Sequence, residues 1–166
     1  MRCLDVLVAD DHPIFVEGLQ AVLSRPGGGK FAFNIQGVAR TGLQISDMMR
    51  QIRPDLLLLD LNLPETDSLK MLPSMKKGSV QTRVLVMTMF DDPRLVKAAF
   101  KAGADGYMLK SGSQAELLQA IEQVIEGHTF LGKGVALDIL YNRSHNGNDG
   151  LPDKQFAGKY GLTRRE

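Results

Sequence analysis

The sequence has few cysteines, no long apolar run and almost no net charge. It therefore lacks the features typical of disulfide-bonded proteins, of membrane proteins and of proteins that bind strongly charged partners. Its 166 residues include one cysteine, Cys3, so no disulfide can form within the chain. We expect Cys3 to be a small buried hydrophobe. The four leucines at 56–59 fall far short of the about 20 apolar residues that span a bilayer. The formal net charge of +1 creates no field that would attract nucleic acid or anionic membranes.

The beginning of the chain shows no apolar run followed by a small-residue cleavage site, and we therefore expect a cytoplasmic protein. The hydrophobic fraction of 43% and the charged fraction of 23% are typical of a soluble globular chain. The length suits one domain of ordinary size and an additional segment.

A run of four leucines that ends in a carboxylate, Asp60, is the strongest local feature. A short, continuous apolar run indicates a strand buried on both faces, as in a parallel sheet covered by helices. A charge at the carboxyl end of such a strand lies where open α/β sheets place their chemistry. Taken alone, Asp60 would more simply mark a solvent boundary.

Strands and amphipathic helices alternate five times along the chain. We predict strands at 4–9, 33–38, 56–59, 84–87 and 106–109. The predicted helices begin at Pro13, after Thr41 as a cap, near Ser68, at Pro93 and after Ser113 as a cap, with Glu116 completing a capping box. Pro73 predicts a kink in the third helix or its division into two pieces. The pattern predicts an α/β fold with a doubly wound, five-stranded parallel sheet of order 2-1-3-4-5.

Chemically useful side chains follow four of these strands. The first strand ends in Asp10 and Asp11, the third in Asp60, the fourth in Thr88 and the fifth in Lys110. In the order 2-1-3-4-5 these ends converge where the strand order reverses. Converging carboxylates raise one another's pKa or require a cation, and oxygen ligands suit Mg²⁺. With an ammonium and a hydroxyl beside it, Asp60 would be a nucleophile for phosphoryl transfer.

This pattern resembles the receiver domain of two-component response regulators over about residues 3–127. The resemblance implies a flavodoxin-like receiver fold in which Asp60 accepts a phosphoryl group from a sensor histidine kinase. It implies that Asp11, Asp60 and the backbone carbonyl of Asn62 coordinate Mg²⁺, with assistance from Asp10. It makes the protein a phosphoacceptor rather than an enzyme, with at most slow self-dephosphorylation.

The resemblance also implies a switch. Lys110 would pair with the phosphoryl group, while Thr88 would bind it and move together with Tyr107. This movement would rearrange the face made by the fourth helix, the fifth strand and the fifth helix, which the family often uses to form homodimers.

One segment and two single residues depart from the family pattern. The segment Pro64-Glu65-Thr66-Asp67-Ser68 stands where the family usually has Pro-Gly-Met-Asp-Gly. Met89 replaces a small side chain after Thr88, and we predict that it narrows access to Asp60. Ser111 replaces the frequent proline after Lys110, which leaves the geometry of that peptide bond open.

The composition changes after Gly127. We interpret residues 128–161 as a linker with room for a short helix at 135–141, because residues 142–150 are rich in turn formers. Residues 162–166, Leu-Thr-Arg-Arg-Glu, resemble the start of a LuxR-type helix-turn-helix. This predicts a transcriptional regulator cut before its output domain, which would bind DNA where this fragment would not.

Three other interpretations remain. A flavodoxin-like domain that binds FMN would need a glycine- and hydroxyl-rich loop after the first strand, where the chain has Asp10-Asp11-His12-Pro13. An aspartate-nucleophile phosphatase would resemble Asp-x-Asp, whereas the acids here are adjacent. A receiver-like interaction domain could switch without phosphate. The three histidines show no metal-type spacing with cysteine or with each other, and we place His12 at a helix entry and His128 and His145 in solvent.

Overall fold

Six parallel strands form one sheet in the order β2-β1-β3-β4-β5-β6 in the computed structural model, which describes residues 1–25 and 29–135. The strands are β1 (Arg2–Ala9), β2 (Phe31–Ala39), β3 (Leu56–Leu59), β4 (Arg83–Thr88), β5 (Gly106–Leu109) and β6 (Phe130–Leu131). The first five have the predicted order, and β3 and β5 have the predicted bounds. β1 is two residues longer at its start than the apolar pattern predicts, and β2 and β4 are one or two residues longer at both ends.

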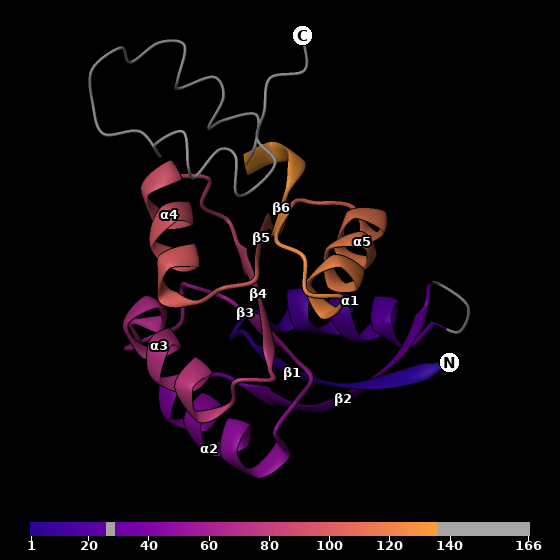
Figure 1. Cartoon of the computed structure of the whole chain (residues 1–166), viewed down its shortest axis with the longest axis horizontal. Helices are drawn as coiled ribbons and strands as arrows, with labels where there is room; N and C mark the ends of the chain where they lie inside the picture. Colours follow the sequence, from indigo (N-terminus) through magenta and orange to yellow (C-terminus); the bar gives the residue numbers. More distant parts are fainter. Residues whose placement is uncertain (26–28, 136–166) are drawn as a thin grey trace, which may run out of the picture.

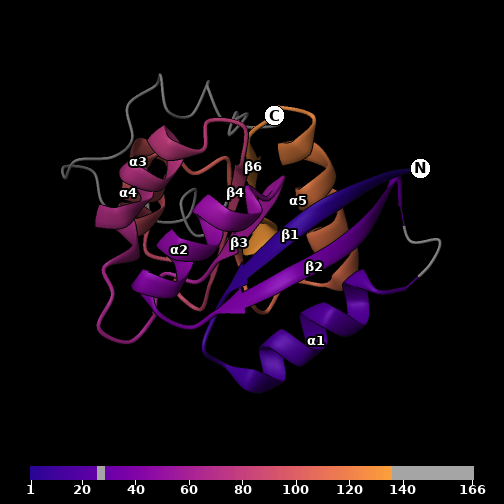
Figure 2. The ribbon, with the colours of Figure 1, turned by 90° about the horizontal axis from the view of Figure 1, so that it is seen from below.

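Five helices cover the two faces of the sheet. They are α1 (Pro13–Leu23), α2 (Gly42–Ile52), α3 (Ser68–Gly78), α4 (Pro93–Ala102) and α5 (Gln114–Ile125). Figures 1 and 2 show α2, α3 and α4 on one side of the strands and α1 and α5 on the other. None of the helices in the described part of the chain is both long and apolar enough to cross a membrane.

The leucine run of β3 contributes to both halves of the core because successive side chains of a strand point to opposite faces. Leu57 and Leu59 pack in the cluster under α2, α3 and α4, whereas Leu56 and Leu58 pack in the cluster under α1 and α5. All four are at most 2% exposed. Burial on both faces fixes the register of β3, and therefore the position of Asp60 at its end.

The helices start where their capping residues predict. The Thr41 hydroxyl accepts a hydrogen bond from the N–H of Gln44, and the Ser113 hydroxyl accepts one from the N–H of Glu116. The predicted capping box is only half formed, because Glu116 accepts a hydrogen bond from the N–H of Lys133 instead. Every peptide bond in the described residues is trans, which answers the question left open at Lys110 and Ser111.

α3 runs without interruption through Pro73, so the predicted division into two pieces is wrong. Proline removes one helical hydrogen bond. Tertiary packing holds the helix together, because Leu72 and Met75 on either side are buried against the sheet.

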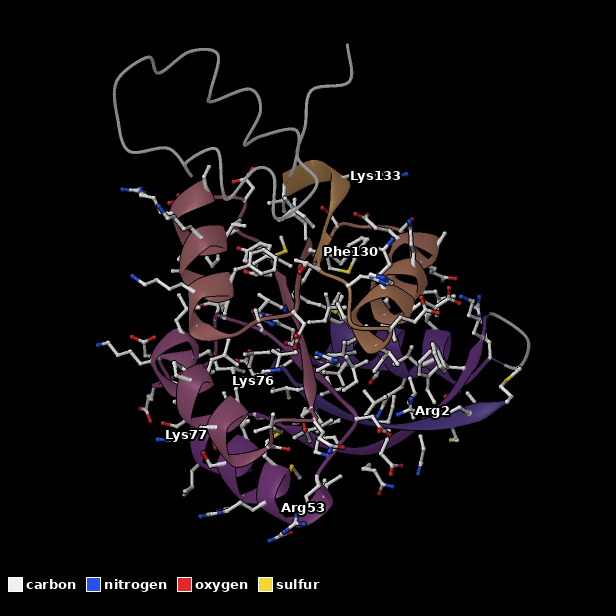
Figure 3. All side chains as sticks on the ribbon, viewed as in Figure 1. Arg2, Arg53, Lys76, Lys77, Phe130 and Lys133 are labelled. Atoms are coloured by element: carbon white, nitrogen blue, oxygen red, sulfur yellow. The ribbon has the colours of Figure 1, made fainter. Side chains whose placement is uncertain are left out.

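The segment after α5 contains structure that the sequence analysis assigned to a linker. β6 pairs with β5 in parallel, and Phe130 joins the core beside α5 (Figure 3). Val135 is fully buried. A two-residue strand is too short to show an alternating pattern. Most of the predicted helix at 135–141, the linker beyond it, His145 and the helix-turn-helix start at 162–166 lie outside the described residues. Cys3 is exposed, so the prediction that it is buried is wrong.

Candidate functional site: an acidic cluster at the carboxyl ends of the strands

The backbone hydrogen bonds of the sheet continue one residue beyond the strands. They hold Asp10, Asp60 and Lys110 at the carboxyl ends of the strands, along one edge of the sheet that we call the rim. The N–H of Asp10 donates to Ala39, the N–H of Asp60 donates to Ala9, and the N–H of Lys110 donates to Thr88. Each functional residue is therefore held by the strand next to its own. The convergence predicted from the strand order is present.

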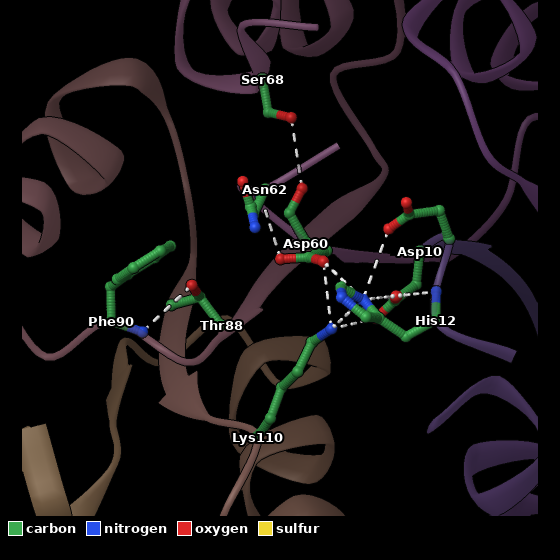
Figure 4. Close-up of polar contacts among 9 residues, drawn as sticks. Asp10, His12, Asp60, Asn62, Ser68, Thr88, Phe90 and Lys110 are labelled. Carbon is green, nitrogen blue, oxygen red and sulfur yellow. Dashed lines mark hydrogen bonds and ion pairs between the residues drawn. The ribbon is translucent and has the colours of Figure 1, made fainter. Parts of the chain in front are cut away.

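Lys110 lies between two of the carboxylates. Its Nζ is 2.7 Å from Oδ2 of Asp10 and 3.0 Å from Oδ2 of Asp60 (Figure 4). The side chains of all three are at most 6% exposed. Lys110 Nζ also lies 4.6 Å from the centre of the Phe15 ring, which attracts a cation through its π face. Because water is excluded, these charges act on one another strongly.

Asp60 is oriented by its own loop as well as by Lys110. Its Oδ1 accepts a hydrogen bond from the N–H of Asn62 at 3.0 Å, and its backbone carbonyl accepts one from the Ser68 hydroxyl at 3.2 Å (Figure 4). Ser68 is the first residue of α3 and is 2% exposed. The loop after β3 is thus tied back to the carboxylate it follows, which gives Asp60 a fixed direction.

Asp11 is the carboxylate of the cluster with a buried oxygen that makes no hydrogen bond. Among the buried side-chain polar atoms of the described residues, its Oδ1 is the one without a hydrogen-bond partner, although Nδ1 of His12 lies 3.4 Å away. A buried, unpaired carboxylate oxygen costs free energy unless a cation or donor reaches it. Asp10, Asp11, His12 and Asp60 each offer a ligand atom, and these atoms lie within 4.8 Å of one another. A buried oxygen without a hydrogen bond, inside a cluster of acids, fits a site for a divalent cation bound by oxygen ligands.

His12 belongs to this cluster, although the sequence analysis placed it only at a helix entry. It is the N-cap of α1, and its side chain makes no capping bond. Its Nδ1 lies 2.7 Å from Oδ1 of Asp10 and 2.9 Å from Nζ of Lys110. Its position directly after Asp10-Asp11 was a signal that could have been used. His128, in contrast, is exposed as predicted.

Thr88 and Tyr107 meet at one residue, Phe90. The Thr88 hydroxyl accepts a hydrogen bond from the N–H of Phe90 at 3.3 Å, and the Tyr107 hydroxyl donates to the carbonyl of Phe90 at 2.7 Å. Thr88 and Tyr107 are fully buried, while Phe90 is 46% exposed. Burial raises the pKa of the Tyr107 phenol well above its usual range, and the acids Asp92 and Asp91 raise it further, so it remains a donor. The sequence analysis named both buried residues but not Phe90, which links them.

Met89 lines the mouth of a groove beside the cluster. It is 71% exposed. The groove measures about 780 Å³ and lies between α1 and the segment from β5 to α5; His12, Phe15, Met89 and Lys110 are among its lining residues. Met89 therefore lines the same groove as two residues of the cluster, His12 and Lys110, and its predicted effect on access to Asp60 remains a prediction.

The loop after β3 differs from the usual family loop in a way that affects its backbone. Glu65 has a φ of 52°, in the left-handed region that favours glycine, and it occupies the position where the family usually has glycine. The neighbouring Thr66 hydroxyl accepts a hydrogen bond from the N–H of Gly42 and donates one to the carbonyl of Pro64. These contacts hold the strained residue in place.

Comparisons with known proteins agree with this geometry. The family model described as the response regulator receiver domain matches residues 6–122. The transcriptional regulatory protein MctR of Rhizobium johnstonii is 33% identical over 90% of this chain and 68% of its own length. The nitrate/nitrite response regulator protein NarL of Escherichia coli is 28% identical over 95% of this chain and 81% of its own length.

Solved structures give the same result. A LuxR-family two-component response regulator from Aurantimonas has a TM-score of 0.77 at 28% identity, covering 86% of this chain and 99% of its own. The receiver domain of the regulator NarL from Mycobacterium tuberculosis has a TM-score of 0.70 at 30% identity, covering 77% of this chain and 100% of its own. These likenesses disfavour the flavin-binding and phosphate-independent alternatives. The chain belongs to the response regulator receiver domain family and is the receiver part of a NarL- and LuxR-type two-component response regulator.

Proposed function

We propose that Asp60 accepts a phosphoryl group from a phosphohistidine of a sensor kinase. The observation that carries the proposal is the burial of Asp10, Asp60 and Lys110 against one another beside the unpartnered oxygen of Asp11. In the transfer, a carboxylate oxygen of Asp60 bonds to phosphorus, the bond from phosphorus to the kinase nitrogen breaks, and its electron pair stays on that nitrogen. Phosphoryl transfer needs positioning and charge neutralisation, and this rim offers both.

Different residues of the chain orient Asp60, neutralise charge and would hold the metal. The N–H of Asn62 and the Ser68 hydroxyl hold Asp60 in one orientation. Lys110 already contacts Oδ2 of Asp60 and places a positive charge where phosphoryl oxygens would develop negative charge. We assign the metal to Asp10, Asp11, Asp60 and the carbonyl of Asn62, and Mg²⁺ is the ion that fits such oxygen donors. Bound there, it would neutralise charge on the phosphoryl group.

The signal would leave the site through Thr88. Its hydroxyl now binds the N–H of Phe90, and it would exchange this bond for one to a phosphoryl oxygen. Phe90 also accepts the hydrogen bond of Tyr107, so the exchange would reach β5. We propose that the face of α4, β5 and α5 responds and forms a homodimer. We further propose a cytoplasmic protein that hydrolyses its own aspartyl phosphate slowly and acts on DNA through an output domain.

We propose domain bounds that follow from these roles. Residues 1–127 form the receiver domain, residues 128–161 connect it to the output domain, and residues 162–166 begin a helix-turn-helix. β6 and Val135 lie within the connecting segment and pack on the receiver, so its first part would move with β5.

The test is a phosphorylation assay read by intact mass. The chain is incubated with a small acyl-phosphate donor, with and without Mg²⁺, and its mass is measured. We expect a gain of one phosphoryl group that requires Mg²⁺ and is absent in Asp60→Asn. The control Asp91→Asn removes an exposed acid and should leave the gain unchanged. A gain that persists in Asp60→Asn would contradict the proposal.

Met89 gives a second, finer test. Because Met89 lines the groove beside Lys110, Met89→Ala should open the approach and speed both phosphorylation and dephosphorylation. Val80→Ala is a matched control, since Val80 is also exposed but belongs to no part of this rim. The rates are measured by the same mass assay over time. Unchanged rates in Met89→Ala would show that Met89 does not limit access to Asp60.

A further inference from the structure

The charged residues of the helices are distributed unequally between the two sides of the sheet. Within their bounds, α1 and α5 carry acids and no lysine or arginine. On the other side, α2, α3 and α4 carry a single acid, Asp47. Their cations are Arg50, Lys70, Lys76, Lys77, Arg94, Lys97 and Lys101. Figures 1 and 2 show these three helices together on one side of the strands, so that side of the molecule is strongly cationic.

A groove of about 610 Å³ lies on this side, between the second half of α2 and α3. Its apolar part is made of methionines, Met49, Met71 and Met75. Its charged lining residues are all cations, Arg50, Arg53 and Lys70. Methionine is flexible and polarisable, and it adapts to the side chains of a partner. The groove therefore combines an adaptable apolar floor with a cationic border.

The cations of the groove have weak partners or none within the described residues. The side chains of Arg50 and Lys70 are 75% and 86% exposed, and ion pairs as exposed as theirs contribute little free energy. Arg53 pairs with no carboxylate of the described part of the chain, and Figure 3 shows it directed away from the sheet. Its φ of 50° lies in the region that favours glycine, so arginine costs stability at this position. Acidic groups brought to the groove would therefore gain all three cations.

The groove has the length of a short helix. It follows α3 from Lys70 to Ser79, which is about 14 Å at about 1.5 Å per residue and accommodates about two and a half helical turns. A helix in a groove places apolar side chains on the floor at every third or fourth position. The phosphates of a nucleic acid would pair with the cations but gain nothing from the methionines. The combination of floor and border therefore favours a polypeptide.

We infer that the α2–α3 groove binds a short amphipathic helix of a partner protein. Its apolar side chains lie against the methionines, and its acidic side chains pair with Arg50, Arg53 and Lys70. Neither Asp60 nor Lys110 lines this groove, so a bound helix leaves the acidic cluster uncovered. The inference goes beyond the proposed function and does not depend on it.

The experiment uses a synthetic peptide of about 12 residues, roughly 18 Å long as a helix. Leucines at helical spacing form one stripe, and glutamates flank it on both sides. Fluorescence anisotropy of the labelled peptide reports its binding to the 166-residue chain. One control peptide has lysines in place of the glutamates, and a second has serines in place of the leucines. We expect the first peptide to bind, and both controls to bind at least about tenfold more weakly.

Variants of the chain locate the bound peptide. Arg50→Glu combined with Lys70→Glu reverses two exposed charges and should weaken binding by about tenfold or more. Ser74→Trp fills the groove without changing its charge and should weaken binding by a similar factor. Lys97→Glu is the matched control, because Lys97 is an exposed cation of α4 outside the groove, and it should change the affinity by less than about threefold. All four residues are exposed, so the variants are expected to fold, and circular dichroism verifies this.

The other outcomes contradict the inference, each in a different way. If the serine peptide binds as well as the leucine peptide, the cationic side attracts acids without using the groove. Binding that is unchanged in Ser74→Trp places the peptide elsewhere. A wild type that dimerises in sedimentation, while Ser74→Trp stays monomeric, shows that the occupant is a second copy of the chain. A DNA duplex that displaces the peptide more strongly than unlabelled peptide does shows a surface for nucleic acid. A leucine peptide that does not bind overturns the inference outright, and none of these results bears on phosphorylation of Asp60.

Discussion

The parallel strands carry charged side chains at both ends, but only the cluster around Asp105, at the amino ends, gives each carboxylate oxygen a hydrogen-bond partner. We call this the balanced end, and the cluster of Asp10, Asp11 and Asp60 the unbalanced end. At the amino ends, Asp105 accepts hydrogen bonds from Lys76 Nζ at 2.9 Å and from the N–H of Val84 at 2.8 Å, and Arg83 lies 3.4 Å away. Figure 3 shows Lys76 directed from α3 toward the sheet, whereas its neighbour Lys77 points outward. Each oxygen of Asp105 is thus used.

At the carboxyl ends, three carboxylates face one lysine and the ring of His12, and a buried oxygen of Asp11 makes no hydrogen bond. The amino-end cluster is complete as folded and serves to hold β4, β5 and α3 together. The carboxyl-end cluster could hold a metal ion, and a cation there would give the Asp11 oxygen a partner. The comparison shows that a functional site can be recognised by unbalanced burial of charge rather than by the number of charges.

The largest effect on stability is expected at the balanced end. Asp105→Ala removes the partner of Lys76, Arg83 and the N–H of Val84, and should lower the free energy of unfolding by about 2–3 kcal/mol. Urea denaturation measures this loss. Phosphorylation of the folded variant should be normal, and Lys77→Ala on the same helix should change stability by less than about 0.5 kcal/mol. A stable Asp105→Ala protein would break the comparison.

At the unbalanced end, removing a charge should stabilise the metal-free protein. Asp11→Asn takes away one of three crowded carboxylates and should raise the free energy of unfolding by about 1–2 kcal/mol in the presence of a chelator. Added Mg²⁺ should raise the melting temperature of the wild type and not that of the variant. If Asp11→Asn is less stable than the wild type without metal, the cluster is not strained by its own charge.

Two residues with a strained backbone, one on each side of β3, allow the two ends of the strands to be compared directly. Arg53 precedes β3 at the amino end and Glu65 follows it at the carboxyl end, and both have a left-handed φ, of 50° and 52°. Glycine at either position should stabilise the protein by about 1 kcal/mol or less, as seen in denaturation curves. Only Glu65→Gly should also speed phosphorylation, because it removes a negative charge from the loop after Asp60. Equal phosphorylation rates in both variants would show that Glu65 acts on the backbone alone.

The smallest effect is expected at a balanced pair on the surface. Asp92 caps α4 and forms an ion pair with Arg94 at 3.1 Å. The Arg94 side chain, and then its N–H, hold the pKa of Asp92 below its ordinary value of 3.8. Asp92→Asn keeps the cap and loses the charge, which should cost about 0.5 kcal/mol at neutral pH.

The sign of the pH dependence follows from that depressed pKa. The charged form is favoured in the folded state, so the contribution of Asp92 is present above pH 3.8 and is lost as the pH falls through the folded-state value. Stability curves of wild type and Asp92→Asn should therefore converge in acid. A gap that widens below that pH would mean that Arg94 does not stabilise the carboxylate.

The sequence predicts most of the fold because its periodic and capping signals are local. Leu56–Leu59 is buried on both faces, and Thr41 and Ser113 cap the helices they precede. Pro73 shows the limit of local reasoning, since packing of Leu72 and Met75 overrides it. β6 was missed because two residues carry no pattern, and Cys3 was misplaced because its strand begins before its apolar part.

The site residues that the sequence predicts are those that end strands. Asp10, Asp60 and Lys110 could be brought together from strand order alone. His12 and Phe90 could not, because their roles depend on side-chain and backbone directions in loops, which no periodic pattern determines. Asp105 was missed for the same reason: its partners, Lys76 and Arg83, come from other elements.

Of the three carboxylates at the carboxyl ends of the strands, we propose that Asp60 alone accepts the phosphoryl group. The most direct measurement is to phosphorylate the chain in Mg²⁺, reduce the acyl phosphate with borohydride and locate the resulting homoserine by tandem mass spectrometry. The account predicts homoserine at position 60 and at none of the other acids. Homoserine at position 10 or 11, or its absence from a chain that has gained a phosphoryl group, would contradict it.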